Sequence, residues 1–433
     1  MTWISRRDFA TAAATAAAAG AAGTAALAGF APAVLGQARA RARVVVVGGG
    51  FGGATTAKYL RALDKNVPVT LVEPAQTFYT CPFSNLVLAG LRTMPSIAHN
   101  YNVLRSKHGV NVVHSAATKV DPAKKTVTLA GGQTLPYEKL VLSPGVDMNW
   151  GAIAGYDEKA SELLPHAWKA GPQTALLRRQ LEAMKDGGVF VIAVPGEPFR
   201  CPPGPYERVS LIAHYLKTKK PKSKILILDS KDSFSKQGLF LGGWKALYDG
   251  MIEWVPLSKD GKVVKVDPKT KSLECELGTK YKGDVVNVVP PQKAGAIAMA
   301  AGVNQGDWCP INPTTFESTK QKDIHVIGDA SIAAPMPKSG FSASTQGKVV
   351  AAAIVAMLQG KEPATPSFAN TCYSLVGPDY GISVANVFVV KDGKLTIAPG
   401  GGLSPAQADA DFRKAEARYA ESWYKANTAE VWG

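Results

Sequence analysis

Three glycines and one glutamate early in the chain have the types and spacing of a dinucleotide-binding site. The sequence Val44-Val-Val-Val-Gly48-Gly-Gly50-Phe-Gly-Gly53 follows the pattern G-x-G-x-x-G. Gly48 permits a tight turn, Gly50 lets the backbone approach a pyrophosphate, and Gly53 lets a helix pack closely against a strand. Glu73 follows Gly53 by about 20 residues and can accept a hydrogen bond from a ribose 2′-OH. The spacing therefore predicts a site for the ADP half of a dinucleotide.

A second nucleotide signal comes late in the chain, at Gly328-Asp329. Together with the first signal it predicts one FAD-binding domain built from two separate pieces of sequence. Asp329 is expected to accept hydrogen bonds from the ribityl chain. A small-residue helix predicted over 342–358 would direct its N-terminus at the flavin, where negative charge develops on reduction. Ala117 and Lys338 complete the predicted cofactor-binding residues, and no metal site is predicted.

The cysteines exclude several kinds of redox site. No C-x-x-C pair occurs, so a thioredoxin-type or zinc-ribbon site is excluded, and no C-x-x-C-H occurs, so this chain binds no c-type haem of its own. An odd number of cysteines leaves at least one thiol outside any intramolecular disulfide. The five are Cys81, Cys201, Cys275, Cys309 and Cys372.

A second strand–helix–strand unit is predicted over 188–229, with a helix over 206–216. Where its glycine turn should stand, the sequence reads Pro195-Gly-Glu-Pro-Phe-Arg-Cys201-Pro-Pro-Gly-Pro. Prolines remove N–H donors and fix φ, and Glu197 would repel a pyrophosphate. We therefore predict a Rossmann-like unit that does not bind a second dinucleotide.

These elements predict an α/β protein with two Rossmann-like domains, one for FAD and one of degenerate NAD type, and a C-terminal α+β domain. At 433 residues the chain is too long for one core. The FAD domain is expected to be discontinuous, with a strand over 319–329 returning to it. The C-terminal domain is expected to contain a hairpin with an Asp-Gly turn and a polar closing helix. The predicted bounds are 41–153 with 291–360, then 154–290, then 361–433.

Residues 1–40 have the features of a twin-arginine signal peptide. Ser5-Arg-Arg-Asp-Phe9 precedes an Ala/Gly-rich stretch, and Ala38-Arg39-Ala40 offers a small-x-small cleavage site. A membrane anchor is the poorer alternative, because the stretch is mostly Ala and Gly. No later segment is expected to supply the ~18 apolar residues needed to span a bilayer, so no stable membrane insertion is predicted. We expect a periplasmic protein exported in the folded state.

The formal net charge is +15. Nucleic acid is not expected as a partner in a periplasm. The charge is either an ordinary solvated surface or a field that steers an anionic substrate or an acidic redox partner.

Three runs carry a resemblance to a known family. They are Tyr79-Thr-Cys81-Pro-Phe-Ser-Asn85, Arg200-Cys201-Pro-Pro-Gly-Pro-Tyr-Glu-Arg208 and Asn370-Thr-Cys372-Tyr. From about position 41 onward the chain resembles the flavoprotein subunit of flavocytochrome c sulfide dehydrogenase, within the disulfide-reductase-like flavoproteins.

The resemblance implies roles for three cysteines. It implies that FAD is attached through a thioether to Cys81, and that Cys201 and Cys372 form a redox-active disulfide over the flavin. The alternatives are a buried apolar thiol at Cys81 and a purely structural disulfide. The resemblance also implies a heterodimer with a c-type cytochrome, so that haem is present only on the partner chain. Cys275 and Cys309 are interpreted as structural.

The expected reaction is the oxidation of sulfide to sulfur or polysulfide. Hydrosulfide would attack the disulfide, and electrons would pass through the flavin to the cytochrome. Glu207, six residues beyond Cys201, is the candidate base, and an exposed helix glutamate is the alternative. Three other functions remain open: a sulfide:quinone oxidoreductase, an NAD(P)H-dependent disulfide reductase, and a non-catalytic flavoprotein partner of a sulfur-oxidation complex.

Overall fold

The valine run before the glycines forms the central strand of a five-stranded parallel sheet. A computed structural model describes residues 43–433, so the predicted signal peptide over 1–40 lies outside the described residues. All four residues of β1 are buried, as expected for a parallel strand covered on both faces. The strand order is β20 (Ile324–Val326), β9 (Lys139–Leu142), β1 (Val44–Val47), β2 (Val69–Val72) and β5 (Asn111–Val113).

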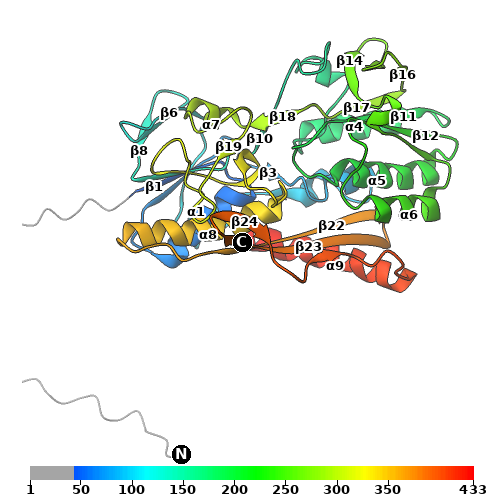
Figure 1. Ribbon diagram of the computed structural model, residues 1–433. Coiled ribbons are helices and arrows are strands. Elements are labelled where there is room, and N and C mark those ends of the chain that lie inside the picture. Colours follow the sequence, from blue (N-terminus) through cyan, green and yellow to red (C-terminus); the bar gives the residue numbers. More distant parts are fainter. Residues whose placement is uncertain (1–42) are drawn as a thin grey trace, which may run out of the picture. The chain divides into compact units, whose positions relative to one another are not determined.

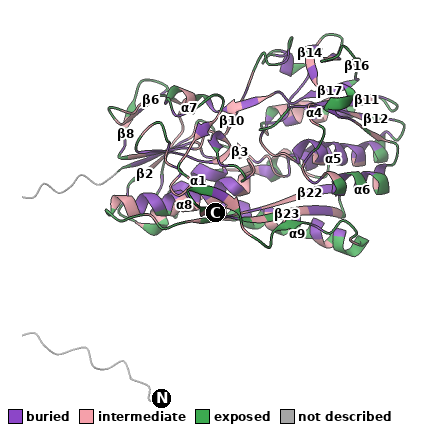
Figure 2. Ribbon diagram, in the orientation of Figure 1, coloured by how far each residue is buried: buried purple, intermediate pink, exposed green. Residues whose placement is uncertain are grey.

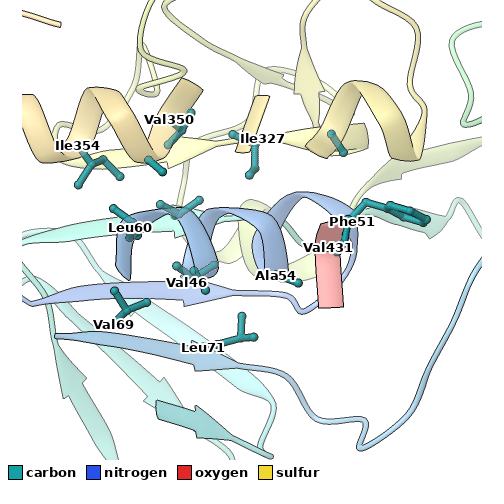
Figure 3. Close-up of a cluster of buried hydrophobic side chains, with 14 of the residues drawn as sticks. Val46, Phe51, Ala54, Leu60, Val69, Leu71, Ile327, Val350, Ile354 and Val431 are labelled. Carbon is teal, nitrogen blue, oxygen red and sulfur yellow. The ribbon is translucent and has the colours of Figure 1, made fainter. Parts of the chain in front are cut away.

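Helices α1 (Phe51–Leu63) and α8 (Gly340–Leu358) pack together beside this sheet (Figure 1). Figure 3 shows Val350 and Ile354 of α8 facing Leu60 of α1. Helix α8 begins at Gly340, two residues before the predicted start. Its N-cap is Ser339, whose side chain accepts a hydrogen bond from the Ser342 N–H.

Helix α8 corrects one expectation about membrane spans. It is long and apolar enough to cross a membrane by length and composition, although no such segment was expected after residue 40. In the structure 56% of its 18-residue apolar window is buried inside the protein. Its apolar residues therefore belong to the core that it shares with α1.

The second parallel sheet has the order β13-β12-β11-β17. Its crossover helix α5 (Gly204–Lys219) is buried along most of its length, as Figure 2 shows. It starts two residues before the predicted helix, since Pro205 suits the first helical turn, where no N–H partner is needed. The other elements are β13 (Ile252–Val255), β12 (Lys224–Asp229), β11 (Val189–Val194), β17 (Val285–Val288) and α6 (Gln237–Tyr248).

The chain returns to the first sheet through β20, which pairs in parallel with β9. This strand is shorter than the predicted run over 319–329, because Gly328 and Asp329 begin a 3₁₀ turn. Gly328 has φ of 72°, a conformation that ends an extended strand. Residues 43–433 lie within one compact unit, and the domain bounds given above stay a prediction.

An antiparallel sheet and a long helix close the chain. The predicted hairpin is present between β23 and β24, and its turn residues Asp392 and Gly393 have φ of 51° and 71°, as a type I′ turn requires. Helix α9 packs against both β22 and β23. It is not uniformly polar, because one face is buried, including Ala420 and Val431. The bounds are β22 (Ser367–Gly377), β23 (Tyr380–Lys391), β24 (Lys394–Ile397), β25 (Gly402–Leu403) and α9 (Ala410–Trp432).

The remaining α-helices and strands of the described residues lie between the elements named above. They are β3 (Phe78–Tyr79), α2 (Ser84–Leu88), β4 (Ala98–His99), α3 (Asn102–Ser106), β6 (Ala117–Asp121), β7 (Thr126–Leu129), β8 (Thr134–Pro136), β10 (Val146–Met148), α4 (Pro172–Ala183), β14 (Val263–Asp267), β15 (Ser272–Cys275), β16 (Lys280–Lys282), β18 (Gln292–Ala294), α7 (Ala296–Ala300), β19 (Cys309–Pro310) and β21 (Ser331–Ile332).

Candidate functional site

A cavity of about 710 Å³ lies beside the carboxyl end of β1. Its shape depends on the glycine turn: Gly48 has φ of +100°, and a Cβ there would lie 2.2 Å from the Ser143 carbonyl oxygen. A Cβ on Gly53 would lie 1.8 Å from the Gly48 carbonyl oxygen, so the helix can approach the turn only with glycine there. Predicted residues that line this cavity are Gly48, Gly50, Glu73, Cys81, Ala117 and Asp329.

Two acidic residues in this cavity have different environments. Glu73 accepts a 2.8 Å hydrogen bond from the Gly49 N–H, so its carboxylate also fixes the glycine turn. Asp329 has one carboxylate oxygen that is buried and without a hydrogen-bond partner among the described residues. Burial raises the pKa of Asp329. A buried acceptor beside a cavity requires a donor, and a ligand hydroxyl such as that of a ribityl chain would supply one.

Lys338 does not line the large cavity. Its Nζ donates hydrogen bonds to the carbonyl oxygens of Asp329 at 2.7 Å and Ser331 at 2.8 Å, and lies 3.8 Å from the centre of the Trp308 ring. Burial lowers the pKa of Lys338 to about 8. Its carbonyl oxygen accepts a hydrogen bond from the N–H of Cys201. These contacts of Lys338 hold two loops in place, and its role in cofactor binding stays a prediction.

Three cysteines from distant parts of the sequence meet at a second, smaller pocket of about 60 Å³. Cys81 comes from the loop before α2, Cys201 from the loop before α5, and Cys372 from β22. The small pocket adjoins the large cavity, because Cys81, Arg200 and Gly340 line both. The N-terminal end of α8 therefore borders both spaces, and its direction toward the flavin stays a prediction.

All five cysteines of the described residues are free thiols. The disulfide between Cys201 and Cys372 is thus not formed in this structure and stays a prediction. Cys275 in β15 and Cys309 in β19 are buried in separate apolar clusters and do not line the small pocket. Their placement agrees with the structural interpretation.

Hydrogen bonding and charge distinguish the pocket thiols. The neighbouring Cys201 thiol lowers the pKa of Cys81, and nearby Arg200 adds to this shift. Cys81 and burial in turn raise the pKa of Cys201. Burial raises the pKa of Cys372, and Lys236 opposes that shift. The pocket can therefore hold one sulfur as an anion while another stays protonated.

Glu207 lines the small pocket and is partly buried, so the alternative of an exposed helix glutamate is wrong. Its two carboxylate oxygens accept 2.9 Å hydrogen bonds from the Asn85 side-chain amide and from the Leu375 N–H. Burial raises the pKa of Glu207 despite these donors. A carboxyl group with a raised pKa beside reactive thiols can accept and return protons.

Arg208 is a site residue that sequence reasoning missed. It is 2% exposed, and its guanidinium donates to the side-chain oxygens of Asn85 and Asn287 and to two backbone carbonyls. It also lies 4.8 Å from the centre of the Trp168 ring. Both Arg208 and Asn85 fall within the motif runs quoted above. Their contacts with each other across 123 residues had no local signal.

Three family models match successive parts of the chain. Residues 42–171 match the pyridine nucleotide-disulphide oxidoreductase model. Residues 174–290 match the central part of the sulfide dehydrogenase (flavocytochrome c) flavoprotein chain, and residues 364–432 match the flavin-binding part of flavocytochrome c sulphide dehydrogenase. FAD is therefore the indicated cofactor, and the cavity geometry around Gly48 and Asp329 fits it.

Individual relatives also include sulfide dehydrogenase and sulfide:quinone oxidoreductase proteins. The chain is 76% identical over 45 residues to a sulfide dehydrogenase (flavocytochrome c) flavoprotein chain of Chlorobaculum thiosulfatiphilum, which covers 10% of this chain and 94% of that sequence. It is 25% identical over 370 residues to the sulfide-quinone reductase of Aquifex aeolicus, covering 79% and 83%. The solved sulfide:quinone oxidoreductase of Aquifex aeolicus has a TM-score of 0.68 at 18% identity, covering 90% and 91%. The predicted α/β fold class is confirmed.

Proposed function

Because this chain belongs to the family of flavocytochrome c sulfide dehydrogenase flavoprotein chains, we propose that it oxidises sulfide through a Cys201–Cys372 disulfide and passes electrons to a c-type cytochrome. The observation that carries the proposal is the meeting of Cys201 and Cys372 in a pocket that adjoins the FAD cavity. Two cysteines at such a junction can undergo thiol–disulfide exchange with a sulfur substrate on one side and would face the flavin on the other.

The proposed reaction begins with attack of hydrosulfide on the disulfide. A new S–S bond forms between the substrate sulfur and one cysteine, the Cys201–Cys372 bond breaks, and the other cysteine leaves as a thiolate. Glu207 holds the proton released from the substrate. FAD, when bound, accepts two electrons and releases them singly, which suits a haem acceptor.

We further propose that Cys81 binds the flavin covalently. Its place at the boundary of the large cavity and the small pocket supports this, because a thioether there would hold the ring system beside Cys201. The neighbouring Cys201 thiol and the positive charge of Arg200 lower the pKa of Cys81 and so favour its thiolate, which is the form that acts as a nucleophile.

The electron acceptor distinguishes this proposal from the alternative of a sulfide:quinone oxidoreductase. A quinone acceptor is supported by the 25% identity to the sulfide-quinone reductase over most of the chain. A soluble cytochrome acceptor is supported by α9, whose buried face packs against β22 and β23 inside the protein. We therefore propose a heterodimer with a cytochrome that carries the haem, and no stable membrane insertion.

The test is an anaerobic titration of the purified holoprotein with sulfide, followed by flavin absorption. Bleaching at near-stoichiometric sulfide and recovery with oxidised cytochrome c is the expected result. Recovery with a quinone analogue and none with cytochrome c would assign the quinone function instead. Formation of a complex with a cytochrome but no bleaching by sulfide would indicate a non-catalytic flavoprotein.

We propose that the protein is exported to the periplasm by the twin-arginine route. The Ser5-Arg-Arg-Asp-Phe9 sequence and the small residues before Arg41 support this. N-terminal sequencing of protein released from the periplasm should begin at Arg41. Protein found only in the cytoplasm with its N-terminus intact would contradict the proposal.

A further inference from the structure

Lys236 is a buried lysine beside Cys372 that the proposed reaction has not used. It is 4% exposed, and its Nζ donates hydrogen bonds to the Ser374 hydroxyl at 2.9 Å and to the Cys372 carbonyl oxygen at 3.0 Å. The same Nζ lies 3.8 Å from the Cys372 sulfur. A buried ammonium is costly unless an anion or several hydrogen bonds offset the loss of water.

No ion pair within residues 43–433 includes Lys236. The lysine is nevertheless held in one place by its backbone. It is the N-cap of α6 with φ of 61°, a conformation uncommon for residues with a side chain, and its carbonyl oxygen accepts the N–H groups of Leu239 and Phe240. Such residues persist where the surrounding structure fixes them, often at functional sites. The nearest sulfur, that of Cys372, is thus the natural place for an opposing negative charge.

We propose that Lys236 is a positioning residue that holds the negative charge on the sulfur carried by Cys372 during sulfide oxidation. This inference rests on the proposed function. Attack of hydrosulfide converts a neutral disulfide into one persulfide and one thiolate. If Cys201 is attacked, Cys372 leaves as the thiolate; if Cys372 is attacked, it carries the persulfide, whose proton passes to Glu207. Cys372 bears one negative charge in both cases, so Lys236 stabilises the products and the transition state more than the disulfide.

The other charged groups around Cys372 do not replace Lys236. Glu207 on α5 and Cys81 both oppose ionisation of Cys372, and Lys236 favours it. Cys201 and Arg200 line the same pocket. The guanidinium of Arg208 is already hydrogen-bonded to two asparagines and two carbonyl oxygens. On α9, which also packs against β22, Glu416 accepts hydrogen bonds from Ser383 and Ser404.

The test is the pH dependence of Cys372 alkylation in the reduced holoprotein. Iodoacetamide is the probe, and the modified peptide is measured by mass spectrometry. An opposite charge at this distance lowers a pKa by about 1–3 units. We therefore expect Lys236→Met to raise the apparent pKa of Cys372 by at least about one unit, and to slow alkylation near neutral pH about tenfold or more. Lys236→Arg should restore part of the shift.

Lys220→Met is the matched control. Lys220 is also buried, and it lies at the end of α5 in the same Rossmann-like unit. Its Nζ donates hydrogen bonds to the carbonyl oxygens of Glu182 and Met184 and to no cysteine. This variant should leave the Cys372 profile unchanged. If Lys236→Met loses its flavin, Lys236→Gln makes the same comparison while retaining polar contacts.

An unchanged Cys372 profile in a flavin-loaded Lys236 variant would overturn the inference. The same variants should also slow flavin reduction by sulfide, a readout that tests the proposed function separately. If the wild-type flavin is not reduced by sulfide at all, the proposed function fails. The alkylation profile still decides whether Lys236 acts on Cys372.

Discussion

The side-chain amide of Asn85 donates a 2.9 Å hydrogen bond to Oε2 of Glu207, 122 residues further along the chain. This contact joins α2, which directly follows the loop that carries Cys81, to α5, which follows Cys201. Asn85 also accepts a hydrogen bond from Arg208, so one amide orients both charged side chains of α5 at the pocket.

Glu207 should determine the acidic limb of the pH profile. Burial raises the pKa of its carboxyl group above the ordinary value, so the carboxylate that acts as base is lost as pH falls through that raised pKa. We expect kcat/KM for sulfide to decrease below it. Glu207→Gln should remove this limb and lower kcat/KM by about 10²- to 10⁴-fold. Steady-state rates across pH provide the measurement.

Glu253→Gln is the control for that profile, because Glu253 is exposed on β13. Ionisation of sulfide itself is common to all variants, so the difference between profiles reports on the enzyme. A limb that survives in Glu207→Gln would show that another group acts as the base.

Gly53→Ala should weaken FAD binding. The new Cβ would lie 1.8 Å from the Gly48 carbonyl oxygen, which forces the turn and α1 apart. Overpacking of this kind destabilises a protein by about 1–3 kcal/mol. Flavin content and the thermal unfolding midpoint should both decrease. Gly196→Ala is the control: a Cβ there meets no atom within 4 Å, and the second Rossmann-like unit is not predicted to bind a dinucleotide. Equal loss of flavin in both variants would refute the assignment.

Cys81→Ser should release the flavin on acid precipitation, whereas wild-type flavin should stay with the protein pellet. The physical reason is that serine cannot form the proposed thioether. Absorbance of the supernatant measures the released flavin. Cys275→Ala serves as the control, since Cys275 lies in a separate apolar cluster. Flavin that is extractable from wild-type protein would rule out covalent attachment.

Cys372→Ser should abolish sulfide-dependent reduction of cytochrome c and leave the bound flavin in place. Cys372 lines the small pocket and does not line the large FAD cavity, so its loss removes the disulfide without removing cofactor contacts. Stopped-flow absorbance separates flavin reduction from cytochrome reduction. Turnover that persists in this variant would contradict the disulfide mechanism.

NADH should not bleach the flavin. The turn after β11 begins with Pro195 and includes Glu197, which is exposed, so it offers few N–H donors and a repulsive charge to a pyrophosphate. An anaerobic titration with NADH, followed by sulfide in the same cuvette, makes the comparison within one sample. Bleaching by NADH would favour the disulfide-reductase alternative.

The sequence itself determined the glycine turn, its flanking strand and helix, the second strand–helix–strand unit and the Asp-Gly hairpin. Each is a local pattern: turn sterics and hydrophobic periodicity act over a few residues, so a single sequence contains them. The contacts of Lys338 with Asp329 and Trp308 had no such local pattern, because they depend on how two loops pack.

Only the tertiary structure decided which side chains share the pocket. Cys81, Cys201 and Cys372 come from three distant segments, and the sequence could link them only through a family resemblance. Lys236 had no signal at all, since it becomes a neighbour of Cys372 only when α6 packs against β22. Long-range packing is set by burial of apolar surface across the whole core, and no short run of residues specifies it.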